Sequence, residues 1–228
     1  MPSASWTVRV GDQAVSAAFD AATTGKATAT FLCAHGAGGN MNDRGVLAIS
    51  AEMRRRGLDV VRFNFPYSER KSRRPDPMPS LQQCIVAVAD YAREAIGSTW
   101  WFIGGRSMGG RAASMLAADG FACDGLLLLA YPLHPAGQPA KLRDAHLPSI
   151  KLPTLCLNGT NDALCRRDLM DAVVERLRPN WTMHWLEGAD HSFHVTKASG
   201  RTNADVMDEI GASTAAWIAS LENRATRD

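Results

Sequence analysis

Hydrophobic and polar residues follow two alternating patterns along the chain. Short, mostly apolar runs predict buried strands at 28–34, 59–63, 99–103, 124–130, 154–158 and 181–186. Between them, apolar residues recur at helical spacing and predict helices at about 43–56, 81–95, 111–118, 167–177 and 203–222. This alternation indicates an α/β fold with a mostly parallel central sheet and helices on both faces.

Two segments near the N-terminal half break the alternation. Residues 5–10 and 14–19 flank Gly11 and Asp12, a turn pair, and predict an opening antiparallel hairpin. Residues 66–79 are rich in proline and arginine, which favours a loop. The chain has no internal repeat and no low-complexity segment.

The connection between strands 124–130 and 154–158 is too short for a helical lid domain, so we expect an open pocket. The chain has 228 residues, 46% of them hydrophobic and 21% charged, which is enough to form a sizeable core. We therefore expect a single domain over residues 1–228.

Charge and terminal sequence narrow the function classes. The net charge of +2 offers no global electrostatic attraction to nucleic acid or to a membrane surface, and we expect neither as a partner. The N-terminal residues lack the basic and apolar regions of a signal peptide, and no apolar run approaches the length of a membrane span. The sequence leaves the oligomeric state open.

The five cysteines are expected to be reduced thiols, which favours a cytoplasmic protein. No pair has the spacing of a metal site, so we expect no metal and no cofactor. Three cysteines lie in strand-like runs and Cys84 lies on an apolar helix face, whereas Cys165 lies in a loop close to a candidate catalytic residue.

The segment Gly105-Arg106-Ser107-Met108-Gly109 combines a motif with its proper context. It follows the predicted strand 99–103 and precedes the predicted helix 111–118. A G-x-S-x-G sequence between a strand and a helix is typical of a nucleophile elbow, a tight turn that exposes the serine hydroxyl above the sheet. Ser107 is therefore the candidate nucleophile.

A serine hydroxyl needs a base to accept its proton and an acid to orient that base. Asp162 follows strand 154–158 and His191 follows strand 181–186, and loops after parallel strands meet at one edge of the sheet. We expect Asp162 as the acid and His191 as the base. Asp190 and Asp124 are weaker alternatives for the acid, and His194 is the alternative base.

An oxyanion hole needs two backbone N–H groups aimed at one point. We expect one from Met108, which follows the nucleophile. The other is expected from the glycine-rich loop after strand 28–34, with Ala37 as the first choice and Gly38 as the second. His35, at the start of this loop, is expected to anchor it.

With these residues in place, the chain resembles the α/β-hydrolases, in which nucleophile, acid and base follow one another in this order. Within that superfamily it is similar to small lid-less dienelactone-hydrolase-like proteins, and to the related testis-expressed and chromatin-complex (NSL-type) proteins. The strings that carry this similarity are His35-Gly36-Ala37-Gly38-Gly39, Arg62-Phe63-Asn64-Phe65-Pro66-Tyr67, Gly104 to Arg111, Tyr131-Pro132-Leu133-His134-Pro135 and Gly188-Ala189-Asp190-His191. The resemblance implies the same roles for Ser107, Asp162 and His191. Dienelactone hydrolases carry cysteine at the elbow, so dienelactone itself is not the expected substrate.

The sequence thus predicts a serine hydrolase that cleaves a carboxylic ester or a related acyl compound through an acyl-enzyme. Two alternatives stay open. One is a hydrolase-fold interaction module with little turnover, and the other is an acyltransferase that uses the same three residues. The expected partner of the leading hypothesis is a small acyl substrate.

Several basic residues are candidates for substrate binding. Arg70 and Arg73 lie in the basic segment Tyr67 to Pro75, which either binds a substrate anion or is a solvated charge run. Arg106 either pairs with an acidic neighbour, which the sequence favours, or helps an anionic substrate to dock. His134, Arg143 and His146, in the connection after strand 124–130, are candidates for the rim of the pocket.

Overall fold

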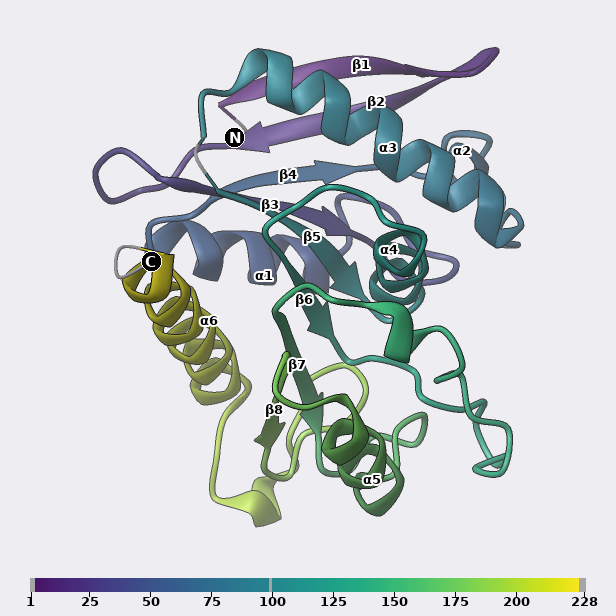
Figure 1. The fold of residues 1–228 in the computed structure, drawn as a ribbon, viewed down its shortest axis with the longest axis vertical. Helices are drawn as coiled ribbons and strands as arrows, with labels where there is room; N and C mark the ends of the chain where they lie inside the picture. Colours follow the sequence, from purple (N-terminus) through teal and green to yellow (C-terminus); the bar gives the residue numbers. More distant parts are fainter. Residues whose placement is uncertain (1–2, 99, 226–228) are drawn as a thin grey trace.

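An eight-stranded sheet runs through the molecule in the computed structural model, which describes residues 3–98 and 100–225 (Figure 1). The spatial order is β1-β2-β4-β3-β5-β6-β7-β8, and β4, β3 and β5 to β8 are mutually parallel. The strands are β1 (Ala4–Val10), β2 (Gln13–Asp20), β3 (Ala29–Ala34), β4 (Asp59–Phe63), β5 (Trp100–Arg106), β6 (Gly125–Leu129), β7 (Thr154–Gly159) and β8 (Trp181–Leu186). The mostly parallel sheet predicted from the alternation is confirmed.

Helices cover both faces of this sheet (Figure 1). One face packs on α3 (Met78–Ala95), α4 (Met108–Ala118) and α5 (Arg167–Leu177), and the other on α1 (Arg44–Arg55) and α6 (Asn203–Ala225). The central strands are apolar along their whole length because both of their faces are buried.

The opening hairpin is present and forms the edge of the sheet. β1 pairs with β2 in antiparallel register from Ala4 opposite Phe19 to Val10 opposite Gln13, and β2 then pairs antiparallel with β4. Thr99, expected at the start of the elbow strand, lies outside the described residues.

Two expectations about element boundaries were wrong. The segment expected as a loop over 66–79 begins with the short helix α2 (Pro66–Glu69) and ends inside α3, which starts at Met78. Proline at the first turn favours both starts, because a first-turn residue has no intrahelical acceptor for an N–H group. Helix α4 begins at Met108 rather than at 111, so it follows the serine without a gap.

The connection between β6 and β7 carries one 3₁₀ turn, η1 (Leu147–Ser149), and no helical lid. A second 3₁₀ turn, η2 (Lys197–Ser199), precedes α6. Within the described residues, none of the helices is both long enough and apolar enough to cross a lipid bilayer.

Candidate active site

Ser107 lies at a sharp turn between β5 and α4. Its φ of 51° and ψ of −117° are a combination that residues with a Cβ rarely adopt. Glycine on either side makes the turn possible. A Cβ on Gly105 would lie 2.2 Å from the carbonyl oxygen of Ala34, and one on Gly109 would lie 2.6 Å from that of His35. The motif thus lets the loop after β3 pass directly against the serine.

Three side chains from distant parts of the chain form one line of hydrogen bonds. His191 Nε2 lies 2.9 Å from Ser107 Oγ, and His191 Nδ1 lies 2.8 Å from Asp162 Oδ2. The Asp162 side chain is fully buried, whereas that of His191 is 24% exposed. A buried carboxylate beside Nδ1 favours the tautomer in which Nδ1 carries the proton and Nε2 accepts one from the serine.

The Asp162 carboxylate is held on several sides. Its Oδ1 accepts the Leu164 N–H at 2.8 Å, and its Oδ2 also accepts an Asn158 Nδ2–H at 3.2 Å. The buried Asn158 amide is itself locked by the backbone N–H and carbonyl of Tyr131. The sequence analysis assigned no role to Asn158. The feature that could have indicated one is its polar side chain near the end of the otherwise apolar strand β7.

The loop that carries His191 is held together by hydrogen bonds to Asp190. The Asp190 carboxylate accepts the N–H groups of Ser192 and His194, so it serves its own loop and does not contact the imidazole of His191. Phe193 is buried with a positive φ of 62°, and its N–H donates to the Asp190 carbonyl. The His194 side chain is exposed. The second alternative acid, Asp124, lies just before β6, at the amino ends of the parallel strands and away from the site, and it accepts the Trp101 N–H.

The loop after β3 lies against the nucleophile. A Cβ on Gly36 would be 3.6 Å from Ser107 Cβ, which places the next residue, Ala37, beside the serine. In the described part of the chain, no acceptor engages the N–H groups of Ala37 and Met108. The N–H of Gly38 instead lies close to the Tyr67 hydroxyl. The geometry therefore favours Ala37 over Gly38.

His35 anchors this loop, as the sequence suggested. Its Nδ1 lies 2.8 Å from the Gly36 carbonyl, and its Nε2 accepts the Phe65 N–H at 3.2 Å. Burial lowers the pKa of His35, so the ring stays neutral and keeps both bonds. The Tyr67 hydroxyl donates to the Gly36 carbonyl, and burial raises the pKa of Tyr67 to about 12.

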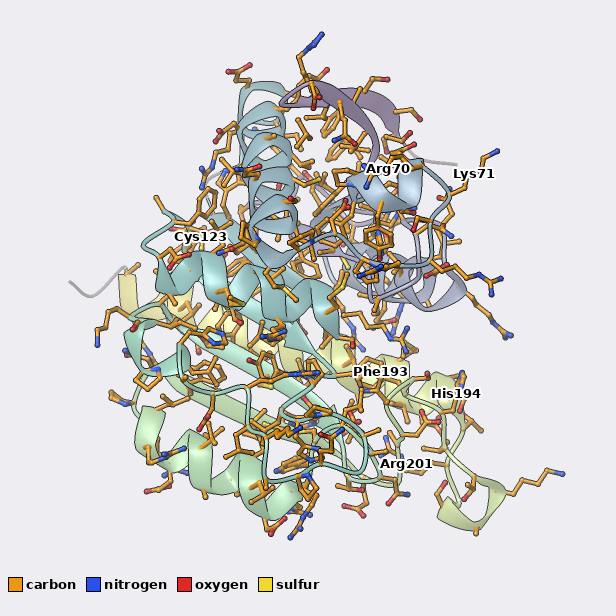
Figure 2. All side chains as sticks on the ribbon, turned by 90° about the vertical axis from the view of Figure 1, so that its right-hand side faces the viewer. Arg70, Lys71, Cys123, Phe193, His194 and Arg201 are labelled. Carbon is orange, nitrogen blue, oxygen red and sulfur yellow. The ribbon has the colours of Figure 1, made fainter. Side chains whose placement is uncertain are left out.

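The two arginines of the basic segment have different surroundings. Arg70 donates to Asp76 and to Gln13 of the opening hairpin, and Figure 2 shows it beside α2, well apart from Phe193 and His194. Its role is thus to hold the segment to the hairpin. Arg73 is exposed, and its carbonyl lies 3.5 Å from the point that a Cβ on Gly38 would occupy. It helps to line a hollow of about 390 Å³ beside the loop after β3.

Arg106 does not have the acidic partner that the sequence favoured. Its Nη2 donates to the His191 carbonyl at 3.2 Å and to Ser192 Oγ at 2.9 Å, both uncharged acceptors. Among the described residues, no carboxylate forms an ion pair with its guanidinium.

The three residues expected at the pocket rim are largely engaged in the connection itself. His134 is buried, with Nδ1 at 2.9 Å from the Pro135 carbonyl and Nε2 accepting the Arg166 N–H. His146 Nε2 lies 2.8 Å from Ser114 Oγ on α4. Arg143 donates weakly to the Pro132 carbonyl, and burial together with the nearby Arg111 charge lowers its pKa. His134 is therefore structural and does not form a rim.

The cysteines are all free thiols, and Cys165 is buried beside Asp162. Burial first, and then the Asp162 charge, raise the pKa of Cys165, so it stays a neutral thiol despite its position. Across residues 3–98 and 100–225, no three histidine, cysteine or acidic side chains are arranged to hold a metal ion.

Solved structures of other proteins share this fold. A lid-less α/β serine hydrolase from Xanthomonas campestris is 21% identical, with 95% of each chain covered and a TM-score of 0.74. A dienelactone hydrolase from Anabaena variabilis is 17% identical, with 95% of this chain and 96% of that chain covered and a TM-score of 0.70. Est1E from Butyrivibrio proteoclasticus, solved with ferulic acid bound, is 16% identical, with coverages of 94% and 99% and a TM-score of 0.75.

The model of one protein family covers most of the chain. It is described as the alpha/beta hydrolase domain, and it matches residues 27–219, from just before β3 into α6. That range includes the elbow, the loop after β3 and the loops that carry Asp162 and His191. On this match, and with a lid-less sheet like those of its structural neighbours, the chain belongs to the alpha/beta hydrolase family.

Proposed function

We propose that this protein is a serine hydrolase that cleaves a carboxylic ester or a related acyl compound. The observation that carries the proposal is the line of hydrogen bonds from Ser107 through His191 to the buried Asp162. If these three residues only stabilised the fold, the serine would not need a strained backbone that turns its hydroxyl toward a histidine nitrogen.

Each residue has a distinct task in this reaction. His191 Nε2 takes the Ser107 proton as Oγ attacks the carbonyl carbon, and Asp162 stabilises the imidazolium that forms. The N–H groups of Ala37 and Met108 stabilise the oxyanion. His191 then gives its proton to the leaving alcohol. Water attacks the acyl-enzyme in the same way and restores Ser107, so the cycle needs no cofactor.

The structural neighbours support acyl chemistry. One is named for a lactone substrate, and another was solved with a bound carboxylic acid. Both names concern carboxyl compounds, which agrees with a site built to attack a carbonyl carbon. The elbow serine of this chain differs from the cysteine of dienelactone hydrolases, so we propose an ester other than dienelactone.

The first test is labelling with a fluorescent fluorophosphonate, which reacts with activated serines. We expect stoichiometric labelling of wild type and none of Ser107→Ala or His191→Ala, as measured by gel and intact mass. Asp162→Asn is expected to slow labelling by about 10³-fold or more, because the amide favours the wrong imidazole tautomer. Circular dichroism of each variant checks that it is folded.

His194→Ala is the matched control, because it removes the neighbouring histidine and is expected to label normally. Loss of labelling in His194→Ala alone would make His194 the base. Absence of labelling in folded wild type would overturn the proposal and favour the interaction-module hypothesis. A product assay with a competing alcohol acceptor separates hydrolysis from acyl transfer.

The free cysteines support a reducing location. All five are unpaired, and most are buried. We propose that the protein acts in the cytoplasm, where such thiols stay reduced.

A further inference from the structure

A pocket of about 400 Å³ is lined by α1, α6, Arg106 and the loop that carries His191. We name it the α1–α6 pocket. It is lined by Arg44, Gly45 and Ala48 of α1, by Arg106, by Ser192 to His194, and by Asn203, Ala204 and Met207 of α6. Ser107 and His191 are not among its lining residues, although their chain neighbours Arg106 and Ser192 are.

The polar side of this pocket is cationic. Arg44 and Arg106 supply its charge, Ser192, His194 and Asn203 add polar side chains, and no lining residue carries a carboxylate. Arg106 makes both of its hydrogen bonds through Nη2. Its Nη1 has no acceptor among the described residues, and a Cβ on Gly45 would lie 3.8 Å from it. The guanidinium thus sits against the first turn of α1, where the helix dipole adds further positive potential.

Three acidic residues that lie within two positions of pocket residues in the sequence each accept hydrogen bonds from nearby N–H groups. Asp43 accepts both the backbone N–H and the side-chain amide of Asn40. Asp190 accepts two N–H groups of its own loop, and Asp205 accepts the Thr202 N–H. These carboxylates keep their negative charge, but within the described residues none of them forms an ion pair with Arg44 or Arg106, so both guanidiniums can engage an anion in the pocket.

The other side of the pocket is apolar. Ala48 and the half-buried Met207 face it from the two helices, and Phe193 also lines it, next to His194 (Figure 2). A cationic end and an apolar wall in one cavity fit a ligand with an acidic group and a short hydrocarbon body.

We propose that the α1–α6 pocket binds a small organic anion, with its carboxylate or phosphate on Arg106 and Arg44 and its apolar part against Met207 and Phe193. This goes beyond the hydrolase proposal, which assigns nothing to this pocket. Binding here needs no turnover, so it can be tested on wild type and on Ser107→Ala alike.

The probe is sodium hexanoate, titrated to tens of millimolar at constant ionic strength, with thermal unfolding followed by circular dichroism. We expect a saturable rise in the unfolding midpoint, because a ligand that binds only the folded state stabilises it. Acetate, which lacks the apolar body, and hexanol, which lacks the charge, are expected to bind more weakly. Inorganic phosphate tests the second kind of acidic group.

Two variants change the pocket in different ways. Arg106→Gln removes the central cation and is expected to weaken hexanoate binding by about tenfold or more, the value of a charge-assisted hydrogen bond. Met207→Glu leaves Arg106 and its bond to the His191 carbonyl intact, but places a carboxylate in the pocket and is expected to abolish binding. Arg9→Gln, an exposed arginine on the edge strand β1, is the matched control and should bind as wild type does.

A midpoint that does not respond to hexanoate, or a response unchanged by both pocket variants, would overturn the proposal. Fluorophosphonate labelling in the presence of hexanoate identifies the source of the anion. Slower labelling of Ser107 indicates that the anion occupies a site used by the acidic end of a substrate. An unchanged rate indicates a separate ligand that binds beside a working site.

Discussion

Ser107 is the residue at which backbone strain and proposed chemistry coincide. Its φ of 51° raises Oγ toward His191, and the close approach of Ala34 and His35 leaves the turn no room to relax. Such a conformation costs on the order of 1–3 kcal/mol for a residue with a Cβ. The fold maintains it because the surrounding strand and helix are fully packed.

The strain predicts an unusual stability order. The free energy of unfolding of Ser107→Gly is expected to exceed that of Ser107→Ala by about 1 kcal/mol, because the relief of strain exceeds the extra chain entropy of glycine. Neither variant should label with a fluorophosphonate. Equal stability of the two variants would show that the turn is not strained. Urea unfolding followed by tryptophan fluorescence measures the difference.

At the scale of elements, a buried ion pair joins the N-terminal hairpin to the parallel sheet. Arg62 on β4 donates to Asp20 on β2, with side chains only 5% exposed. Ser50 of α1 donates to the same carboxylate, and Arg62 also holds the Met41 carbonyl. The pair therefore links β2, β4, α1 and the segment that follows the candidate oxyanion loop.

Breaking this pair from one side should be costly. Arg62→Met alone leaves the Asp20 carboxylate buried without its charge partner, and a loss of about 3–5 kcal/mol in the free energy of unfolding is expected. Replacing both residues, with Asp20→Leu and Arg62→Met, should recover a large part of that loss. A double-mutant cycle in urea measures the coupling. A loss below about 1 kcal/mol in Arg62→Met would contradict the prediction, because that is the range of an exposed pair.

At the scale of the whole molecule, the buried His35 and the half-buried His146 couple folding to pH. Burial is the main cause that lowers the pKa of both His35 and His146, and the Arg111 charge adds to it at His146. The unfolded chain protonates these rings near their ordinary pKa of about 6.5, whereas the folded chain resists protonation. The folded state is therefore favoured above that pH and loses stability below it.

We expect the free energy of unfolding to fall as the pH decreases from about 7.5 to about 5.5, before carboxylates begin to titrate. His146→Gln should reduce the slope, because glutamine can still bond to Ser114 and does not titrate in this range. Urea midpoints at several pH values measure it. A flat profile in wild type, or an unchanged slope in the variant, would contradict this assignment.

The amino-acid sequence by itself determined the sheet, most of its helices and the order of the candidate site along the chain. These follow from local patterns, namely apolar runs, helical periodicity and the glycines around Ser107, whose effects act over a few residues. The errors were also local: prolines that looked like a loop begin α2 and α3.

The tertiary structure alone decided which polar groups meet. The sequence favours Asp162 over Asp190 by its position after a strand, but only the packed loops bring Asp162 to His191 and turn Asp190 toward its own backbone. Arg106 meets the His191 carbonyl across 85 positions of sequence, and the α1–α6 pocket joins helices from opposite ends of the chain. Contacts of this range depend on how the layers pack, which no local pattern encodes.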